Sequence, residues 1–308
     1  MIRHNTKPCP EENRTCGGWS DLLPDLSLEH RLLSTLFTSE ASAAVELNES
    51  QLHDFEQNGF VAGPQVLNSH QLNALRSELS ELVAPDHAGS EWWYEYHSNE
   101  SDDPNKVLFH ALGAWRLRPA FHDLLWHSKV TVPARQLLGG AVRFWHDQLF
   151  CKPARHGGVV AWHQDFSYWT RTSPMAHLTC WIALDDATID NGCVHYILGS
   201  HRWDLLPVTG LAGDMAAIRK VLSDDQWEKF QQPVAVELKA GECVFHHPLT
   251  MHGSFENRTE IPRRAVVLNF ARDGVHSDVD EPLLNGVDVI PAGKPLGGQF
   301  YPLLLAGE

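Results

Sequence analysis

The sequence has no run of about 18 apolar residues, so we expect no transmembrane helix. Residues 1–7 are mostly polar and lack the apolar stretch of a signal peptide. Positive charge is scarce, because 24 Lys and Arg stand against 39 Asp and Glu, for a formal charge of −15. This balance argues against nucleic acid as a partner, since nucleic-acid binding requires a basic surface. We expect neither a nucleic-acid nor a membrane partner.

The six cysteines contain no Cys-X-X-Cys pair, and in 308 residues they are too scattered for a disulfide framework or a zinc site. Scattered reduced thiols are typical of a cytoplasmic protein, which is the location we expect. The motifs of P-loop, Rossmann, zincin and α/β-hydrolase proteins are absent as well. Hydrophobic residues make up 43% of the chain and charged residues 20%, which is ordinary for a globular domain with a sizeable core.

Helical signals dominate the part of the chain before residue 140. Asn48 and Asn68 are expected to cap two helices, the first ending at Asn58-Gly59 and the second carrying leucines at helical spacing. Residues 115–138 predict two more helices, divided near residues 128–133. Residues 1–46 are interpreted as a partly ordered extension.

An aromatic cluster lies between these helices, in a polar stretch with the composition of a loop. Packing on the domain surface is the favoured interpretation, and a substrate lid is the second. The least favoured is a cage that holds a quaternary ammonium ion by cation–π contacts. The residues concerned are Trp92, Trp93, Tyr94 and Tyr96.

From residue 142 onward the pattern changes to short β-rich runs separated by turn signals, which predicts a sandwich or barrel. A helical insert is expected at 210–232, and the Gly- and Pro-rich tail, 276–308, is expected to wrap the surface. The predicted strands are 143–152, 159–165, 178–184, 193–197, 234–238, 242–246 and 264–270.

The pair His163 and Asp165 is the strongest chemical signal. Residues two apart on a β-strand point to the same face, so the imidazole and the carboxylate would lie side by side. Together they supply two thirds of the 2-His-1-carboxylate triad of non-haem Fe(II) oxygenases. A second His-X-Asp sequence, His276-Ser277-Asp278, has no later histidine to complete a triad and is interpreted as a chance match.

His252 is the candidate third ligand, although His246 and His247 are nearby alternatives. Gly253, the next residue, permits close approach of another backbone. An arginine 11 residues after His252 could bind a carboxylate through its two-pronged guanidinium group. The pattern leaves the choice between Arg263 and Arg264 open.

Several ordered motifs together resemble the phytanoyl-CoA dioxygenase family of Fe(II)/2-oxoglutarate-dependent oxygenases. The resemblance covers about residues 47–273. It rests on Trp162-His163-Gln164-Asp165, on His252-Gly253-Ser254 with Asn257 and Arg263, and on three further segments, at 47–61, 146–153 and 181–201.

The resemblance implies a mainly β fold, a double-stranded β-helix or jelly-roll core at 141–275 with packed N-terminal helices at 47–140 and the helical insert. It implies Fe(II), 2-oxoglutarate and O2 as cofactor and co-substrates. His163, Asp165 and His252 would hold the iron, and Arg263, helped by Ser254, would bind the co-substrate's distal carboxylate. Gln148, Trp181 and Lys152 are suspected to line the same site.

Hydroxylation of a small-molecule metabolite is the predicted reaction, because family members that halogenate lack the carboxylate ligand and Asp165 is present. Two alternatives stay open at this point. One is an oxygenase of the same type that desaturates its substrate or closes a ring. The other is a jelly-roll protein that binds or senses a metabolite without turnover.

Overall fold

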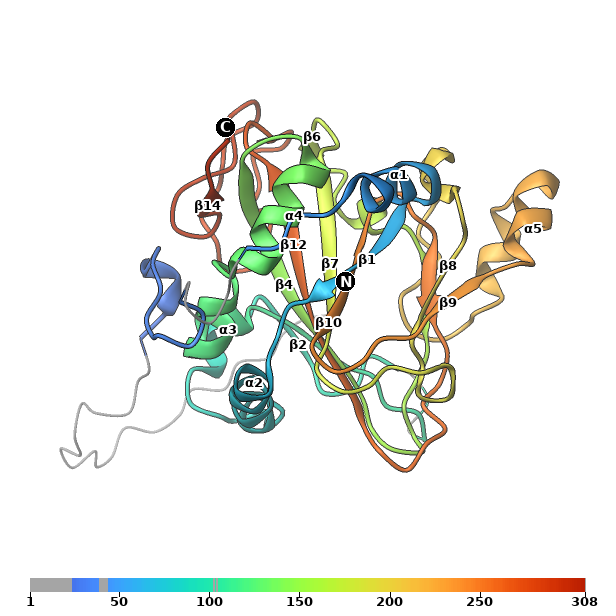
Figure 1. The fold of residues 1–308 in the computed structure, drawn as a ribbon, viewed down its shortest axis with the longest axis horizontal. Helices are drawn as coiled ribbons and strands as arrows, with labels where there is room; N and C mark the ends of the chain where they lie inside the picture. The colour runs from blue at the N-terminus through green and yellow to red at the C-terminus, as the bar shows by residue number, and fades with distance from the viewer. Residues whose placement is uncertain (1–23, 39–43, 102, 104, 308) are drawn as a thin grey trace, which may run out of the picture.

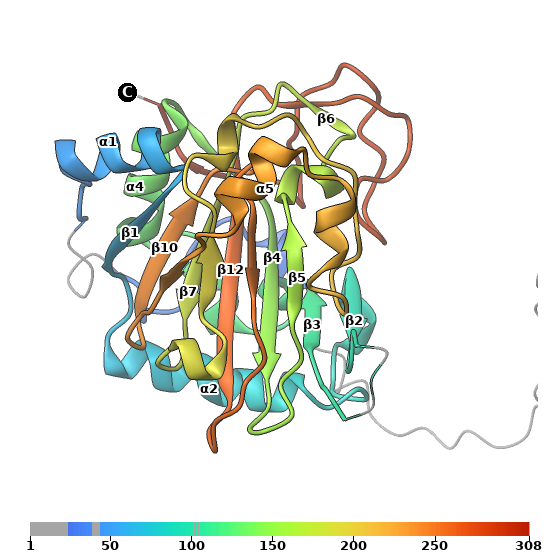
Figure 2. The ribbon, with the colours of Figure 1, turned by 90° about the vertical axis from the view of Figure 1, so that its right-hand side faces the viewer.

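Two facing antiparallel sheets form the centre of the molecule. The computed structural model describes residues 24–38, 44–101, 103 and 105–307. The larger sheet has the order β1-β10-β7-β12-β4-β3-β2, with β14 beside β4, and the smaller has the order β5-β11-β8-β9 (Figure 2). The predicted mainly β, jelly-roll fold is therefore confirmed.

The strands of the larger sheet are β1 (Phe60–Gln65), β10 (Glu242–His246), β7 (His177–Ala183), β12 (Arg263–Arg272), β4 (Val142–Lys152), β3 (Phe109–Leu112), β2 (Glu95–His97) and β14 (Leu303–Leu305). Those of the smaller sheet are β5 (Val160–His163), β11 (His252–Ser254), β8 (Val194–Tyr196) and β9 (Val234–Val236). A separate pair joins β6 (Thr172–Ser173) to β13 (His276–Ser277).

Helices cover the face of the larger sheet that points away from the smaller one (Figure 1). They are α1 (Glu49–Asn58), α2 (Ser69–Leu82), α3 (Pro119–Leu124) and α4 (Ser128–Leu138). The first two begin with reciprocal capping boxes at Asn48 and Asn68, as predicted. Gly59 ends α1 with φ of +83°, and a side chain there would clash with His201 and Thr250.

Two predictions for the region before residue 140 were wrong. The break between the third and fourth helices lies before Ser128, and α4 continues through Pro133. The aromatic stretch is not a loop throughout, because β2 begins at Glu95 and pairs with β3. The strand was missed because it has only three residues and lies at the edge of the sheet. Its formation depends on pairing with β3, which a local pattern does not reveal.

The aromatic cluster packs against the chain itself, as the favoured interpretation held. Tyr94 is buried, and its ring centroid lies 4.9 Å from the Arg116 guanidinium carbon, which also contacts the rings of Trp92 and Phe300. Arg116 forms a buried ion pair with Asp25. Arg116 thus occupies the rings of Trp92 and Tyr94, while the Trp93 ring packs against Tyr96, so the lid and the quaternary ammonium cage are not supported.

The outer segments lie around this core. Near the N-terminus, the backbone N–H groups of Leu33 and Ser34 donate to the buried carboxylate of Asp123 on α3. Within 210–232, a 3-10 helix (Ala217–Lys220) and α5 (Asp224–Phe230) lie over the smaller sheet, where the Phe230 and Trp162 rings are 4.9 Å apart. Toward the C-terminus, β14 adds to the larger sheet.

None of the described helices is long and apolar enough to cross a membrane. Cys151, Cys180, Cys193 and Cys243 are buried free thiols, whereas Cys9 and Cys16 lie outside the described residues. The cytoplasmic location stays a prediction.

Candidate metal centre

His163 and His252 are brought together by strand pairing in the smaller sheet. His163 ends β5, His252 begins β11, and the antiparallel register places the two opposite each other with ring centroids 4.2 Å apart. Gly253 permits this pairing, since a Cβ atom there would lie 3.0 Å from the Val160 carbonyl oxygen. Two histidines 89 positions apart thus share one face of one sheet.

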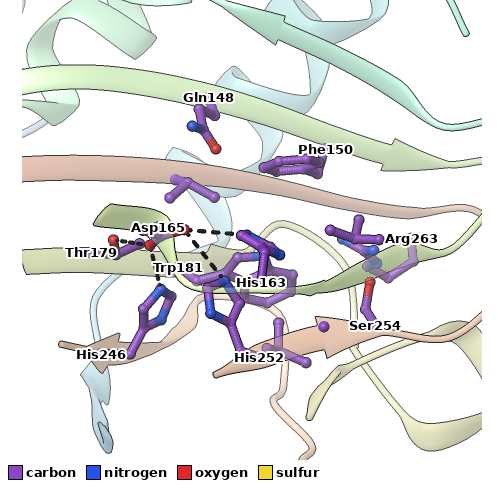
Figure 3. A pocket seen from close by; sticks show the side chains of 14 residues that line it. Gln148, Phe150, His163, Asp165, Thr179, Trp181, His246, His252, Ser254 and Arg263 are labelled. Carbon is purple, nitrogen blue, oxygen red and sulfur yellow. Dashed lines mark hydrogen bonds and ion pairs between the residues drawn. The ribbon is translucent and has the colours of Figure 1, made fainter. Parts of the chain in front are cut away.

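Asp165 reaches the same place from the end of β5. Gln164 is still extended, with φ of −111° and ψ of 129°, and Asp165 then begins a 3-10 helix (Asp165–Tyr168). The strand continues just long enough for the two-residue spacing to place the carboxylate beside His163, as predicted. Figure 3 shows the three side chains converging on one wall of a cavity of about 430 Å³.

The geometry suits a single metal ion. Asp165 Oδ1 lies 3.3 Å from His163 Nε2 and 3.6 Å from His252 Nε2. Two ligands about 2.1 Å from one ion and at right angles to each other are about 3.0 Å apart, so a small closure would bring all three to bonding distance. Among the described residues this is the one group of His, Cys, Asp or Glu that meets the distance requirement for a metal site.

Backbone carbonyls orient both imidazoles toward the shared centre. His163 Nδ1 donates to the Ala161 oxygen at 2.8 Å, and His252 Nδ1 donates to the Thr250 oxygen at 2.9 Å. A carbonyl can only accept, so the proton is on Nδ1 and the Nε2 lone pair is free for a metal. Burial and the neighbouring His163 hold the pKa of His252 well below its usual value, which favours the neutral, ligating form.

The second carboxylate oxygen of Asp165 is held by two donors. Asp165 Oδ2 accepts from Thr179 Oγ1 at 2.7 Å and from His246 Nε2 at 2.9 Å, while the Tyr196 hydroxyl donates to His246 Nδ1 at 3.0 Å. Burial opposes ionisation of Asp165, but the pKa of its carboxyl is held well below the usual value by the surrounding histidines, of which His246 donates a hydrogen bond to Oδ2. Asp165 is thus ionised, with Oδ1 turned toward the two metal-facing imidazoles.

These contacts give His246 a role that the sequence left ambiguous. It lies behind the carboxylate and positions it, and His247 lies farther off, where its Nδ1 accepts from the Leu249 N–H. Thr179 and Tyr196 were not predicted at all. Their contribution depends on β7 and β8 lying beside β10 and β11, which no local pattern reveals.

His246→Ala should weaken iron binding about 10- to 100-fold, the usual cost of losing a hydrogen bond to a metal ligand. His246→Gln keeps an amide N–H near Asp165 Oδ2 and should recover part of the affinity. Anaerobic Fe(II) or Co(II) titration measures the effect, with His247→Ala as the matched control. Unchanged affinity in His246→Ala would remove the positioning role.

Arg263 lies at the far end of the same cavity. It is the first residue of β12 and is 1% exposed, and its Nε and Nη1 atoms have no hydrogen-bond partner among the described residues. Burial lowers its pKa only to about 10, so it remains a cation at neutral pH. A buried, unpaired guanidinium is costly unless a ligand supplies the anion. The site therefore fits a carboxylate.

Arg264 is excluded from this role by its own ion pair. Its Nε and Nη2 atoms donate to the two oxygens of Asp185, each at 2.8 Å, on the opposite face of β12. Adjacent strand residues point to opposite faces, so only Arg263 can face the cavity. The geometry thereby resolves the choice between the two arginines that the pattern left open.

Most of the residues that were suspected to line the site are found in the cavity wall, with one exception. Gln148, Trp181 and Ser254 line it, and the Trp181 ring lies 5.4 Å from the Arg263 guanidinium carbon. Lys152 is the exception. It is fully buried beside Arg263, and its Nζ donates to the carbonyl oxygens of Ser254 and Phe255, so it ties strands together and does not face the cavity.

The second His-X-Asp sequence does not join a cluster. His276 Nδ1 lies 3.2 Å from Asp278 Oδ1, and both side chains are more than a third exposed, at 36% and 40%. The one cluster with metal-ligand spacing among the described residues does not include them. The interpretation as a chance match agrees with this placement.

Comparison with known proteins agrees with the fold and the site. The family model described as phytanoyl-CoA dioxygenase matches residues 55–265. A probable phytanoyl-CoA dioxygenase of Caenorhabditis elegans is 24% identical over 77% of this chain and 78% of its own length. A methylphosphonate hydroxylase of Gimesia maris is 26% identical over 73% of this chain and 80% of its own.

Among solved structures, the non-haem 2-oxoglutarate-dependent carbocyclase SnoK of nogalamycin biosynthesis has a similar fold. The two structures superpose with a TM-score of 0.66 and are 24% identical in sequence. The match covers 84% of this chain and 96% of the carbocyclase chain. Fold and His/Asp/His arrangement together define a non-haem iron dioxygenase that uses 2-oxoglutarate and O2. The chain belongs to the phytanoyl-CoA dioxygenase family, whose model spans most of the core described above.

Proposed function

We propose that the protein hydroxylates an unactivated C–H bond of a small-molecule metabolite, with 2-oxoglutarate converted to succinate and CO2. His163, Asp165 and His252 hold Fe(II), and Arg263, with Ser254 beside it, binds the distal carboxylate of 2-oxoglutarate. The observation that carries the proposal is one cavity with three candidate metal ligands at one end and, at the other, a buried arginine that forms no ion pair with any described residue.

The iron, its ligands, Arg263 and the apolar wall have separate roles in the proposed reaction. The bound iron supplies the oxidising power by coupling O2 reduction to decarboxylation of the keto acid. His163, Asp165 and His252 would hold the ion with three ligands, a set that leaves room for co-substrates. Arg263 sets the orientation of the keto acid through a two-pronged, charge-assisted contact. The apolar wall, formed by Phe150, Val194 and Val267, excludes water from the space between them.

A non-catalytic binding protein is disfavoured by the complete set of ligands and the free arginine. Another oxidative outcome, ring closure or desaturation, is the second candidate, because a protein of similar fold is a carbocyclase. The ligand set is compatible with each of these outcomes, so the product decides between them.

Anaerobic addition of Fe(II) and then 2-oxoglutarate should produce a visible metal-to-ligand charge-transfer band. Absence of the band would favour the binding protein. A metabolite screen that couples succinate release to mass spectrometry of the products should then show a gain of one oxygen atom. Loss of two hydrogens without gain of oxygen would replace hydroxylation by desaturation or ring closure.

A further inference from the structure

A second, larger cavity opens directly onto the metal site. It has a volume of about 1040 Å³ and shares four wall residues with the first: Gln148, Phe150, His163 and Asp165. Gln148 and Phe150, on β4, project across from the metal ligands (Figure 3). A substrate in the larger cavity would thus present one end to the iron. The wall at its other end should then match the substrate's chemistry.

The charge of that wall is acidic. Glu95 and Glu100 both line the cavity, and the hydrogen bond from His110 is the main cause that holds the pKa of Glu100 below its usual value. Arg171 is the one Lys or Arg in the wall, and its two terminal nitrogens donate to the carbonyl oxygens of Pro282 and Leu283. Asp165, the remaining carboxylate, belongs to the candidate metal site.

Tyr168 lines the cavity next to the candidate metal ligand His163. Its ring contacts that of His163, with centroids 6.0 Å apart. Burial, followed by the charges of Asp165 and Glu100, raises the pKa of its phenol to about 12. Tyr168 and Glu100 thus line the same cavity as His163 and Asp165.

Two buried nitrogens in this wall lack partners among the described residues. His110 is 5% exposed and donates from Nδ1 to Glu100 Oε2 at 2.9 Å, and in the neutral imidazole its Nε2 is then an acceptor without a partner. Trp145 is 3% exposed, and its Nε1–H has no acceptor. Buried polar atoms are almost always paired, so an absent ligand is expected to supply an N–H or O–H for His110 and an oxygen for Trp145.

Aromatic rings complete the wall. Trp145, Phe150, Tyr168 and Trp169 line the cavity, and the His110 ring is stacked on Phe150 at 4.5 Å. Aromatic faces next to carboxylates stabilise an organic cation by cation–π attraction in addition to the ion pair. An anionic substrate would meet repulsion from the same wall.

We propose that the substrate class is a small, protonated primary or secondary amine that also carries an oxygen acceptor. Its ammonium group lies between Glu100, Glu95 and His110, its oxygen accepts from Trp145, and the carbon to be oxidised points toward His163 and Asp165. This inference rests on the proposed function, because the metal end of the cavity defines where the reaction occurs.

The proposal is narrower than a preference for positive charge. A quaternary ammonium ion has no N–H and would leave His110 Nε2 unsatisfied, so it should bind less tightly than the amine of the same skeleton. A carboxylate or phosphate ester should bind least, since the glutamates oppose it. The three classes can therefore be ranked in one experiment.

The test uses amino alcohols and amino amides of three to ten carbons, each paired with its N-trimethyl derivative and with the carboxylate of equal chain length. Binding to the anaerobic Fe(II)/2-oxoglutarate complex is measured by calorimetry and by the change in the visible band. The best amines should bind at least about 10-fold more tightly than both paired compounds, a difference of about 1.4 kcal/mol. Glu100→Gln and Glu95→Gln/Glu100→Gln should each remove this preference.

Glu228→Gln is the matched control, since it makes the same charge change on the exposed surface of α5 and should keep the preference. Equal or tighter binding of the carboxylates or N-trimethyl compounds overturns the proposal, and so does failure of every amine to bind. If the visible band never forms, the proposed function itself fails. A band without selective amine binding refutes the substrate class alone.

Discussion

Asp165→Ala and His163→Ala should each abolish succinate formation that depends on the main substrate. Each variant removes one of the three candidate metal ligands. Their donor atoms lie close together, with Asp165 Oδ1 3.3 Å from His163 Nε2 and 3.6 Å from His252 Nε2. Changes behind a metal ligand already cost about 10- to 100-fold in metal affinity or activity, so loss of the ligand itself should exceed about 100-fold. Succinate release is the measurement for turnover, and anaerobic Fe(II) titration is the measurement for binding.

The chain supplies its own matched control for this experiment. His276→Ala and Asp278→Ala make the same changes in the second His-X-Asp sequence. Its side chains are partly exposed and have no third ligand beside them in the part of the chain that the structure describes. Both variants should turn over normally. Full turnover by Asp165→Ala, or equal loss in the two pairs, would contradict the assignment of the metal centre.

Arg263→Ala should raise the KM for 2-oxoglutarate about 10- to 150-fold, because a hydrogen bond to a charged group contributes about 1.5–3 kcal/mol. The KM for the main substrate should change far less, since Arg263 lines the cavity of the metal centre and does not line the larger cavity. Steady-state kinetics with each substrate varied in turn separates the two constants.

Two further variants test whether geometry as well as charge matters at this position. Arg263→Lys keeps the cation but loses the planar two-pronged donor set, so its KM should fall between those of the native protein and Arg263→Ala. Arg264→Gln breaks the ion pair with Asp185 and should lower the melting temperature with little effect on the KM for 2-oxoglutarate. A normal KM in Arg263→Ala would remove the arginine from the co-substrate site.

Local sequence patterns predicted much of the fold. The alternation and turn signals after residue 142 predicted seven strands that the structure contains, with ends that differ by up to two residues. Asn48, Asn68 and Gly59 marked helix ends correctly, since caps are made by residues within one turn. Short strands such as β2 and β11 were missed. These two have three residues each, and they depend on pairing with their neighbours in the sheet.

For the candidate site as well, local sequence predicted some features and tertiary structure determined the others. The spacing of His163 and Asp165 determined that they lie side by side, because strand geometry repeats every two residues. The pattern offered His252 as the third ligand, the resemblance to a family favoured Arg263 over Arg264, and the cavity brings all four residues together.

Tertiary structure alone decided the surroundings of that site. It placed His246 on the carboxylate, and it removed Lys152 from the cavity wall. It also left two nitrogens of Arg263 without a partner among the described residues, while Arg264 is bound to Asp185. It also showed which groups face the larger cavity. Each of these facts depends on contacts between strands far apart in the chain, where hydrogen-bond partners and burial are set by the packing of the sheets and not by neighbours in sequence.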